Sequence, residues 1–290
     1  MDAFEDIYEE KMGKGKSFDS TNQNLVDEKR EEIYKFFTST LTGIVVFGLW
    51  IGFIFSIFSS ISAIGIEDEN IFSEIFSLLV SIVLGIFVPL GFYRLYTGSK
   101  KKDFLQVDSG FNTIITYFKI LKVLLIVSAI FVGFMILLGL IIAPTILLFG
   151  LIAAGFYALA FYIIGIFKSF FVQTSTSFKS AYDTVPSAKK IFNYLVVIFV
   201  IAILGSLIFL LVFQNIETLI PSEFEDQFGP LLAGFTTIRF TFYISLAISL
   251  LSQAYLIYYV SQFEKTFTTF NVYYRKKVED EKRSRFNQPE

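Results

Sequence analysis

Long apolar stretches alternate with polar segments along this chain of 290 residues. A helix needs about 20 residues to cross roughly 30 Å of hydrocarbon, so an apolar stretch of that length predicts a membrane span. Backbone polar groups in lipid must be satisfied within the segment, which favours helices over open sheets. The pattern therefore predicts six helical spans, at 41–64, 75–93, two within 123–167, 191–213 and 231–260.

The stretch 123–167 contains no charged residue and is too long for one crossing. Ala143, Pro144 and Thr145 lie near its middle. Because proline breaks the hydrogen-bond ladder of a helix, this tripeptide is the predicted turn between the third and fourth spans.

Lysine and arginine occupy alternate polar segments, and only Arg239 departs from this alternation. The basic segments are 1–40, 94–122, 168–190 and 261–290, whereas the intervening segments carry acidic residues or no charge. Basic residues accumulate in cytoplasmic loops. The chain is therefore predicted to be an all-α membrane protein with six transmembrane helices and both termini in the cytoplasm.

The predicted spans divide the chain into three regions. Residues 1–40 form a polar cytoplasmic segment that is expected to be partly disordered, residues 41–260 form the transmembrane domain, and residues 261–290 form a charged cytoplasmic helix or tail. Phe263, Phe267, Phe270 and Tyr274 have helical spacing, which predicts that the sixth span continues as an amphipathic helix. The three inner connections look alike, so the unit is either a helical hairpin used three times or a set of similar interfacial segments.

The chain contains no cysteine and no histidine. Disulfides and thiolate sites are excluded, and the commonest general base and metal ligand is absent. The acidic clusters at 67–70 and 223–226 would either bind a divalent cation or simply be solvated loops, and the second interpretation is favoured. No enzyme activity, cofactor or metal is predicted.

Arg239 lies inside the sixth span, close to its outer end. A charge in hydrocarbon is costly, but a long side chain near the interface can extend to water. Phe235 and Tyr243 are its neighbours one turn away, so a cation–π contact with Tyr243 is plausible. Arg239 either fixes the depth of the span, which is favoured, or faces the bundle interior as part of a transport route.

A row of polar residues repeats every four positions through the same span. Such a row drifts around the helix, which suits tight helix packing or a polar path. Its members are Thr237, Thr241, Ser245, Ser249 and Gln253.

Three basic clusters lie next to the predicted cytoplasmic surface. Each basic residue near anionic lipid contributes about 1 kcal/mol of attraction, so contact with lipid head groups is expected, whereas nucleic-acid binding is not. The candidate residues are Lys100, Lys101, Lys102, Lys189, Lys190, Arg275, Lys276 and Lys277.

Residues 92–130 contain an aromatic span end, a short basic stretch, an acidic residue and an F-x-x-L-x-x-Y-x-K-like start of the next span. The residues of this pattern are Phe92, Tyr96, Lys100, Lys101, Lys102, Asp108, Phe111, Tyr117 and Lys119, and Ile114 stands where the pattern has leucine. In these features the segment resembles an uncharacterised family of polytopic membrane proteins found in Bacteroidota. The resemblance implies a membrane topology and a bacterial lineage, and hence a location in the bacterial cytoplasmic (inner) membrane, and it implies no chemistry.

The sequence favours a membrane-embedded scaffold or accessory subunit that works with lipids, protein partners or further copies of itself. The alternative is a small transporter or channel that uses Arg239 and the polar row. Transporters more often carry several intramembrane charges or interrupted helices. The sequence predicts one such charge and no interrupted span besides the Pro144 turn.

Overall fold

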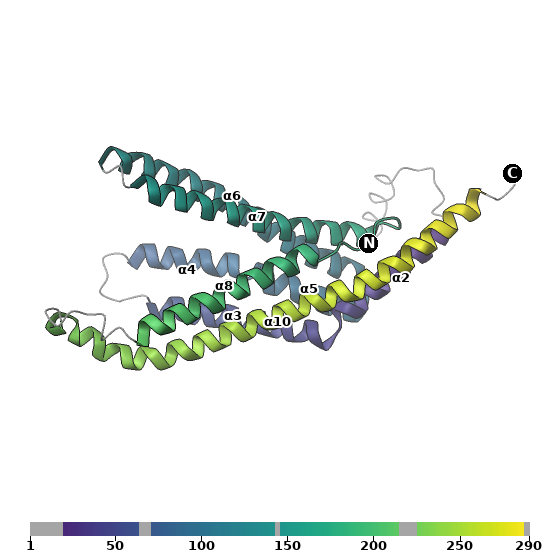
Figure 1. Cartoon of the computed structure of the whole chain (residues 1–290). Helices are drawn as coiled ribbons and strands as arrows, with labels where there is room; N and C mark the ends of the chain where they lie inside the picture. The colour runs from purple at the N-terminus through teal and green to yellow at the C-terminus, as the bar shows by residue number, and fades with distance from the viewer. Residues whose placement is uncertain (1–19, 64–70, 143–145, 215–224, 287–290) are drawn as a thin grey trace. The chain divides into compact units, whose positions relative to one another are not determined.

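A computed structural model describes residues 20–63, 71–142, 146–214 and 225–286, and throughout these ranges the regular structure is helical (Figure 1). The helices are α2 (Ser20–Phe37), α3 (Thr40–Ala63), α4 (Ile71–Gly85), α5 (Phe87–Lys101), α6 (Phe104–Ile142), α7 (Ile146–Lys179), α8 (Lys189–Gln214) and α10 (Glu225–Phe286).

Six helical segments among the described residues are long and apolar enough to cross a membrane. The prediction of a multi-pass, all-helical protein is therefore confirmed. The segments are Thr40–Ile61, Glu74–Lys101, Phe104–Gly139, Gly150–Lys179, Lys189–Ile208 and Tyr243–Asp280.

The second span consists of α4 and α5, which meet at Ile86. Ile86 keeps a right-handed helical backbone, its N–H donates to the Ile82 carbonyl at 3.2 Å, and its carbonyl accepts from the Leu90 N–H at 3.0 Å. Pro89 has no N–H to donate to the Gly85 carbonyl, so one hydrogen bond of the helix is missing there, while residues 74–101 still form one span.

The three connections that the sequence predicts to be cytoplasmic have different local structures. α5 and α6 are joined by a tight turn in which Lys102 adopts a left-handed conformation, with φ of 55°. Residues 180–188 join α7 to α8 mostly without helix, and the sixth span continues as one helix to Phe286. The predicted amphipathic extension of that span is thus confirmed as helix, whereas the similar sequences of the connections do not share one local structure.

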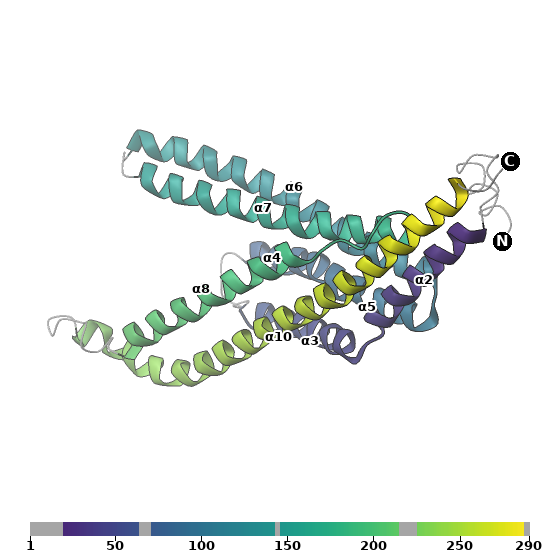
Figure 2. The same cartoon turned by 45° about the vertical axis from the view of Figure 1, so that its right-hand side comes forward.

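The chain forms two compact units, residues 1–186 with 270–290, and residues 187–269. In the first unit α5 packs on α6, and α6 lies antiparallel beside α7, as Figures 1 and 2 both show. In the second unit α8 lies beside α10 in both views.

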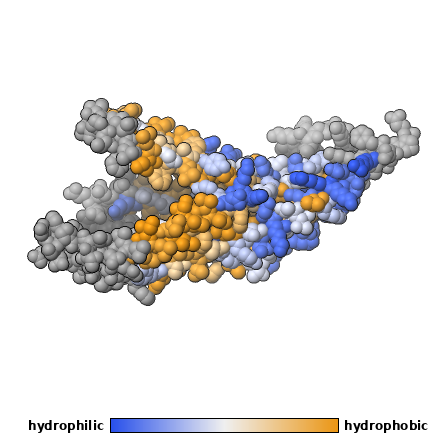
Figure 3. Space-filling view, viewed as in Figure 1, coloured by the Kyte–Doolittle hydropathy of each residue, from blue (hydrophilic) through white to orange (hydrophobic). Residues whose placement is uncertain are grey.

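Within the spans, most apolar side chains point outward. No more than 11% of the residues in the most apolar stretch of any span are buried. In Figure 3 hydrophobic surface covers the α6–α7 hairpin, and hydrophilic surface gathers where α2 and the end of α10 lie. The buried side chains of the first unit are concentrated instead at the polar ends of its helices, where the candidate site lies.

Candidate functional site

Five segments of the first unit meet at the polar ends of its helices: α2, the α5–α6 turn, the end of α7, residues 180–186 and the end of α10. We call this region the polar junction. α2 packs on α5 and α7, and Leu25 of α2 forms a buried cluster with Tyr274 and Val278 of α10. The N-terminal and C-terminal helices are therefore both fixed to the ends of the spans.

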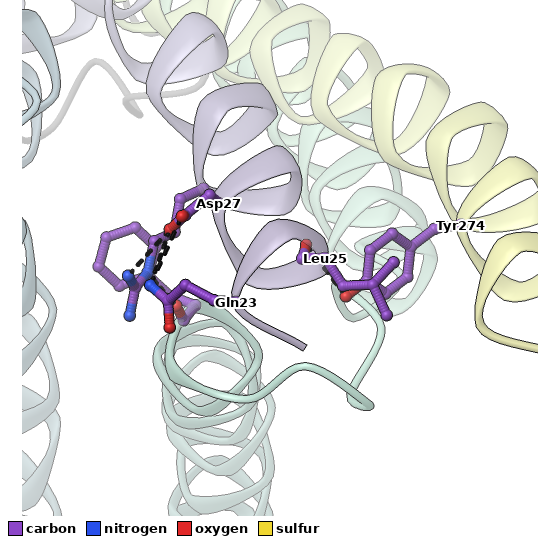
Figure 4. A network of polar contacts seen from close by, with 6 residues as sticks. Gln23, Leu25, Asp27 and Tyr274 are labelled. Atoms are coloured by element: carbon purple, nitrogen blue, oxygen red, sulfur yellow. Dashed lines mark hydrogen bonds and ion pairs between the residues drawn. The ribbon is translucent and has the colours of Figure 1, made fainter. Parts of the chain in front are cut away.

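Tyr274 is the largest fully buried side chain of the protein's described part. Its hydroxyl group donates a hydrogen bond toward the carbonyl oxygens of Ala181 and Leu25, the latter at 3.3 Å. Figure 4 shows the ring lying against Leu25, between α10 and α2. Phe270 stacks on the ring, with a centroid distance of 5.3 Å. One side chain thus joins α10, α2 and the segment that follows α7.

Lys29 lies on α2 beside Tyr274 and is completely buried. Its ammonium group donates to the carbonyl oxygens of Ser180 and of Asp183, the latter at 2.6 Å. The same group lies 4.9 Å from the centroid of the Tyr274 ring, which is a cation–π distance. Because burial disfavours the charged form, the pKa of Lys29 falls from its ordinary value of 10.5 to about 8.

The stability of the protein is expected to rise with pH between about pH 8 and pH 10.5 through Lys29. In this window the unfolded chain keeps the lysine proton, whereas the folded chain has lost it. Unfolding then requires proton uptake, which becomes harder as pH rises. Thermal unfolding of the wild type and of Lys29→Met across this range measures the effect, since the variant lacks the titrating group. The stability of the wild type minus that of Lys29→Met should increase with pH, and a value that stays constant or decreases would contradict the lowered pKa.

Arg30 follows Lys29 on α2 and lies beside two stacked aromatic rings. Its guanidinium group lies 4.5 Å from the centroid of Phe104 and 5.6 Å from that of Phe178, and its Nε donates to the carbonyl oxygen of Phe178 at 3.1 Å. The rings of Phe104 and Phe178 stack at 5.2 Å. Gln23 and Asp27 bond to each other one turn earlier on α2 (Figure 4). Arg30 therefore joins α2 to the start of α6 and the end of α7.

Three ion pairs connect the segments of the polar junction. Asp108 of α6 pairs with Lys179 of α7 at 2.7 Å, and the Asp108 side chain is only 14% exposed. The other two pairs are Lys102 with Glu31 and Lys277 with Glu28. Exposed ion pairs contribute at most about 1 kcal/mol each, so the buried contacts of Tyr274, Lys29 and Arg30 carry more of the stability.

The predicted head-group contacts fall into two sets. Lys102 and Lys277 are engaged by Glu31 and Glu28. The remaining candidates have exposed side chains: Lys100, Lys101, Lys189, Lys190, Arg275 and Lys276. The exposed set is therefore accessible to lipid.

In the second unit, Glu264 of α10 holds the start of α8. Its carboxylate accepts hydrogen bonds from the Ser187 hydroxyl at 2.8 Å, the Ala188 N–H at 2.5 Å and the Thr268 hydroxyl at 3.0 Å. A carboxylate at a helix N-terminus is favoured by the helix dipole. An open groove of about 480 Å³ lies beside this contact.

Only part of the polar row of the sixth span falls within the described side chains. The side chains of Thr237, Arg239 and Thr241 lie outside them, as do the acidic residues at 67–70 and 223–226. Ser245 and Ser249 are exposed, and the Gln253 amide donates to the Ser249 hydroxyl at 3.3 Å. Tyr243 is 37% exposed. The structure brings Ser249 and Gln253 together and leaves the direction of Arg239 as a prediction.

The residues that build the polar junction were not among the predicted site residues. Residues 1–40 were predicted to form a polar, partly disordered segment, yet residues 20–37 form a helix that packs on α5 and α7. The sequence did contain a signal for this helix, because four residues at four-residue spacing form a stripe along one side of it. These residues are Leu25, Lys29, Ile33 and Phe37, and all four side chains are buried. A lysine within an apolar stripe indicates that the group is matched by partners elsewhere in the fold.

No family model, curated protein or solved structure matches the chain. The resemblance of residues 92–130 to a Bacteroidota family accordingly stays a prediction. Among the residues that carry it, Phe111 is buried and packs on Phe178, and Asp108 pairs with Lys179. These contacts hold α6 against α7 in this chain, and this role does not depend on the family resemblance.

Proposed function

We propose that this protein is a scaffold or accessory subunit of a bacterial cytoplasmic membrane, with the polar junction and both termini in the cytoplasm. The observation that carries this proposal is that the best-buried part of the first unit lies at the polar helix ends. A scaffold needs a rigid surface outside the lipid whose position is set by the spans. The buried contacts of the polar junction with the ends of the spans support this role.

The charged groups at the polar junction support contacts rather than chemistry. Lys29 is bonded to two backbone carbonyls, Arg30 lies on aromatic rings, and Asp108 is paired with Lys179. Each group holds two or more segments together. The protein would act by presenting this assembled surface to a protein partner or to a second copy of the chain.

The exposed face at the end of α10 is the surface we assign to such a partner. Val272 and Tyr273 are 70% and 55% exposed, although both are apolar or aromatic. They lie next to the exposed basic residues Arg275 and Lys276. Exposed apolar residues bordered by charges are typical of interaction sites.

A photo-reactive amino acid at position 272 tests the proposal in native membranes. We expect one discrete protein adduct from this position, and loss of that adduct when Tyr274→Ala releases α10 from α2. The matched control is position 131 on α6, where Phe131 is 65% exposed within a span and should contact lipid.

A missing protein adduct at position 272, together with solute flux, would favour the transport alternative. The observation on that side is Arg239, the one basic residue of the sequence inside a predicted span, because intramembrane charges often mark substrate pathways. If purified protein in vesicles passes a solute, if Arg239→Leu abolishes that flux without unfolding the protein, and if position 272 gives no protein adduct, the scaffold proposal is wrong.

A further inference from the structure

An open groove of about 480 Å³ lies between the start of α8 and the middle of α10 in the second unit. Lys189, Phe192 and Asn193 line it from α8, and Lys265 and Thr268 are among the residues that line it from α10. A groove of this volume is large enough for the head group of a phospholipid.

The groove carries net positive charge. Its one carboxylate, Glu264, is satisfied by Ser187, Ala188 and Thr268. Lys189 and Lys265 are exposed and form no ion pair with any residue that the structure describes. Two ammonium groups are therefore directed to the groove region without a protein anion to neutralise them.

The groove also lies at the level where a head group would be found. α8 becomes continuously apolar after Asn193, and Val197 and Ile201 are 54% and 62% exposed along it. On α10 the apolar part of the span ends at Val260, directly before Ser261 of the groove. A phosphate held in the groove would leave acyl chains beside exposed apolar side chains of the same unit.

We propose that this groove binds the phosphate of an anionic phospholipid, with Lys189 and Lys265 as the charged contacts and Asn193 as a hydrogen-bond donor. This assignment goes beyond the scaffold role, because it requires only that α8 and α10 cross a membrane. Free phosphate shares the same chemistry, so the test includes it separately.

The test titrates the purified full-length protein in neutral detergent with fluorescent short-chain phosphatidylglycerol and measures anisotropy. Phosphatidylcholine of equal chain length is the neutral lipid, and inorganic phosphate is the competitor. The double variant Lys189→Gln with Lys265→Gln should weaken phosphatidylglycerol binding roughly tenfold or more. The matched control, Lys190→Gln with Lys276→Gln, removes the same charge from exposed positions that do not line the groove and should change binding less than about threefold.

Three outcomes overturn the proposal: equal weakening in both double variants, unchanged binding in both, or inorganic phosphate saturating the site while phosphatidylglycerol shows no preference over phosphatidylcholine. Because all four lysines are exposed, unfolding temperatures should stay unchanged, which separates lost binding from lost fold. The adduct from position 272 should also persist in the groove variant, so failure of the lipid site and failure of the scaffold role are distinguishable.

Discussion

Replacing Tyr274 with alanine is expected to lower the free energy of unfolding by about 3–5 kcal/mol, the range for removing a large buried aromatic side chain. The side chain is fully buried between α10 and α2. Its removal would leave a cavity next to Leu25, and it would take away the hydroxyl group that bonds the Ala181 and Leu25 carbonyls. It would also remove the ring over which the Lys29 ammonium group lies.

Two further variants show how much of this loss comes from the hydroxyl group and how much depends on burial. Tyr274→Phe keeps the ring and loses only the hydroxyl group, so the expected cost is about 1–2 kcal/mol for the loss of the buried hydrogen bond to the Ala181 and Leu25 carbonyl oxygens. Tyr273→Ala changes the neighbouring tyrosine, which is 55% exposed, and should cost less than about 1 kcal/mol. Thermal unfolding of the purified proteins in one detergent measures all three. If Tyr273→Ala destabilises the protein as much as Tyr274→Ala, the polar junction does not depend on this buried ring.

The spans were predictable because the physics that defines them is local. A helix in lipid needs only sufficient length, apolar side chains and internally paired backbone groups, and each can be read from a single stretch. The same holds for the amphipathic extension of α10, since Phe263, Phe267 and Tyr274 share one helical face and are all buried. Neither prediction required knowledge of a distant segment.

The polar junction was not predictable in this way, because its contacts join residues far apart in the chain. Lys29 bonds Ser180 and Asp183, about 150 positions away, and Tyr274 bonds Leu25. α2 alone reads as a polar helix with a short apolar stripe. Only the assembled fold shows that its lysine points to backbone carbonyls rather than to water or lipid head groups.

Glycine residues in the spans likewise show that contacts between distant segments are hard to predict from the sequence. Glycine within a membrane span can permit close approach of two helices. Gly48, Gly52, Gly133, Gly155 and Gly205 have open space where a side chain would be, and Gly85 and Gly150 lie against the side chains of Phe53 and Ile136. Close approach of one backbone to another occurs between α5 and α6. The glycines that permit it are Gly91, Gly98 and Gly110. Glycine on a span is thus ambiguous until the partner helix is known.

The α5–α6 contact has further polar support, which fixes its register. Arg94 of α5 donates to the hydroxyl groups of Ser109 and Thr113 of α6, at 3.1 and 2.9 Å. The turn is closed by the Asp103 N–H, which donates to the Gly98 carbonyl at 2.8 Å. α5 therefore has little freedom to move away from an added side chain.

Gly110→Ala is accordingly expected to destabilise the protein by about 1–3 kcal/mol, the usual cost of overpacking a tight contact. A methyl group at this position would lie 2.9 Å from the Leu95 backbone nitrogen and 3.0 Å from the Gly91 carbonyl oxygen. Both are backbone atoms, so the helices themselves must separate, and the Arg94 bonds would lengthen.

Gly133→Ala is the matched control, because it makes the same change on the same helix where no heavy atom lies within 4 Å. Alanine favours helix over glycine by up to about 1 kcal/mol, so this variant should be neutral or slightly more stable. The unfolding temperature of each variant in one detergent gives the comparison. If the two substitutions shift that temperature equally, the loss reflects glycine as such, and close approach of α5 and α6 is not what stabilises the hairpin. If only Gly110→Ala lowers the unfolding temperature, the close backbone contact between α5 and α6 stabilises the hairpin. We then conclude that this contact holds the α5–α6 turn against α2, and that the geometry of the polar junction depends on it.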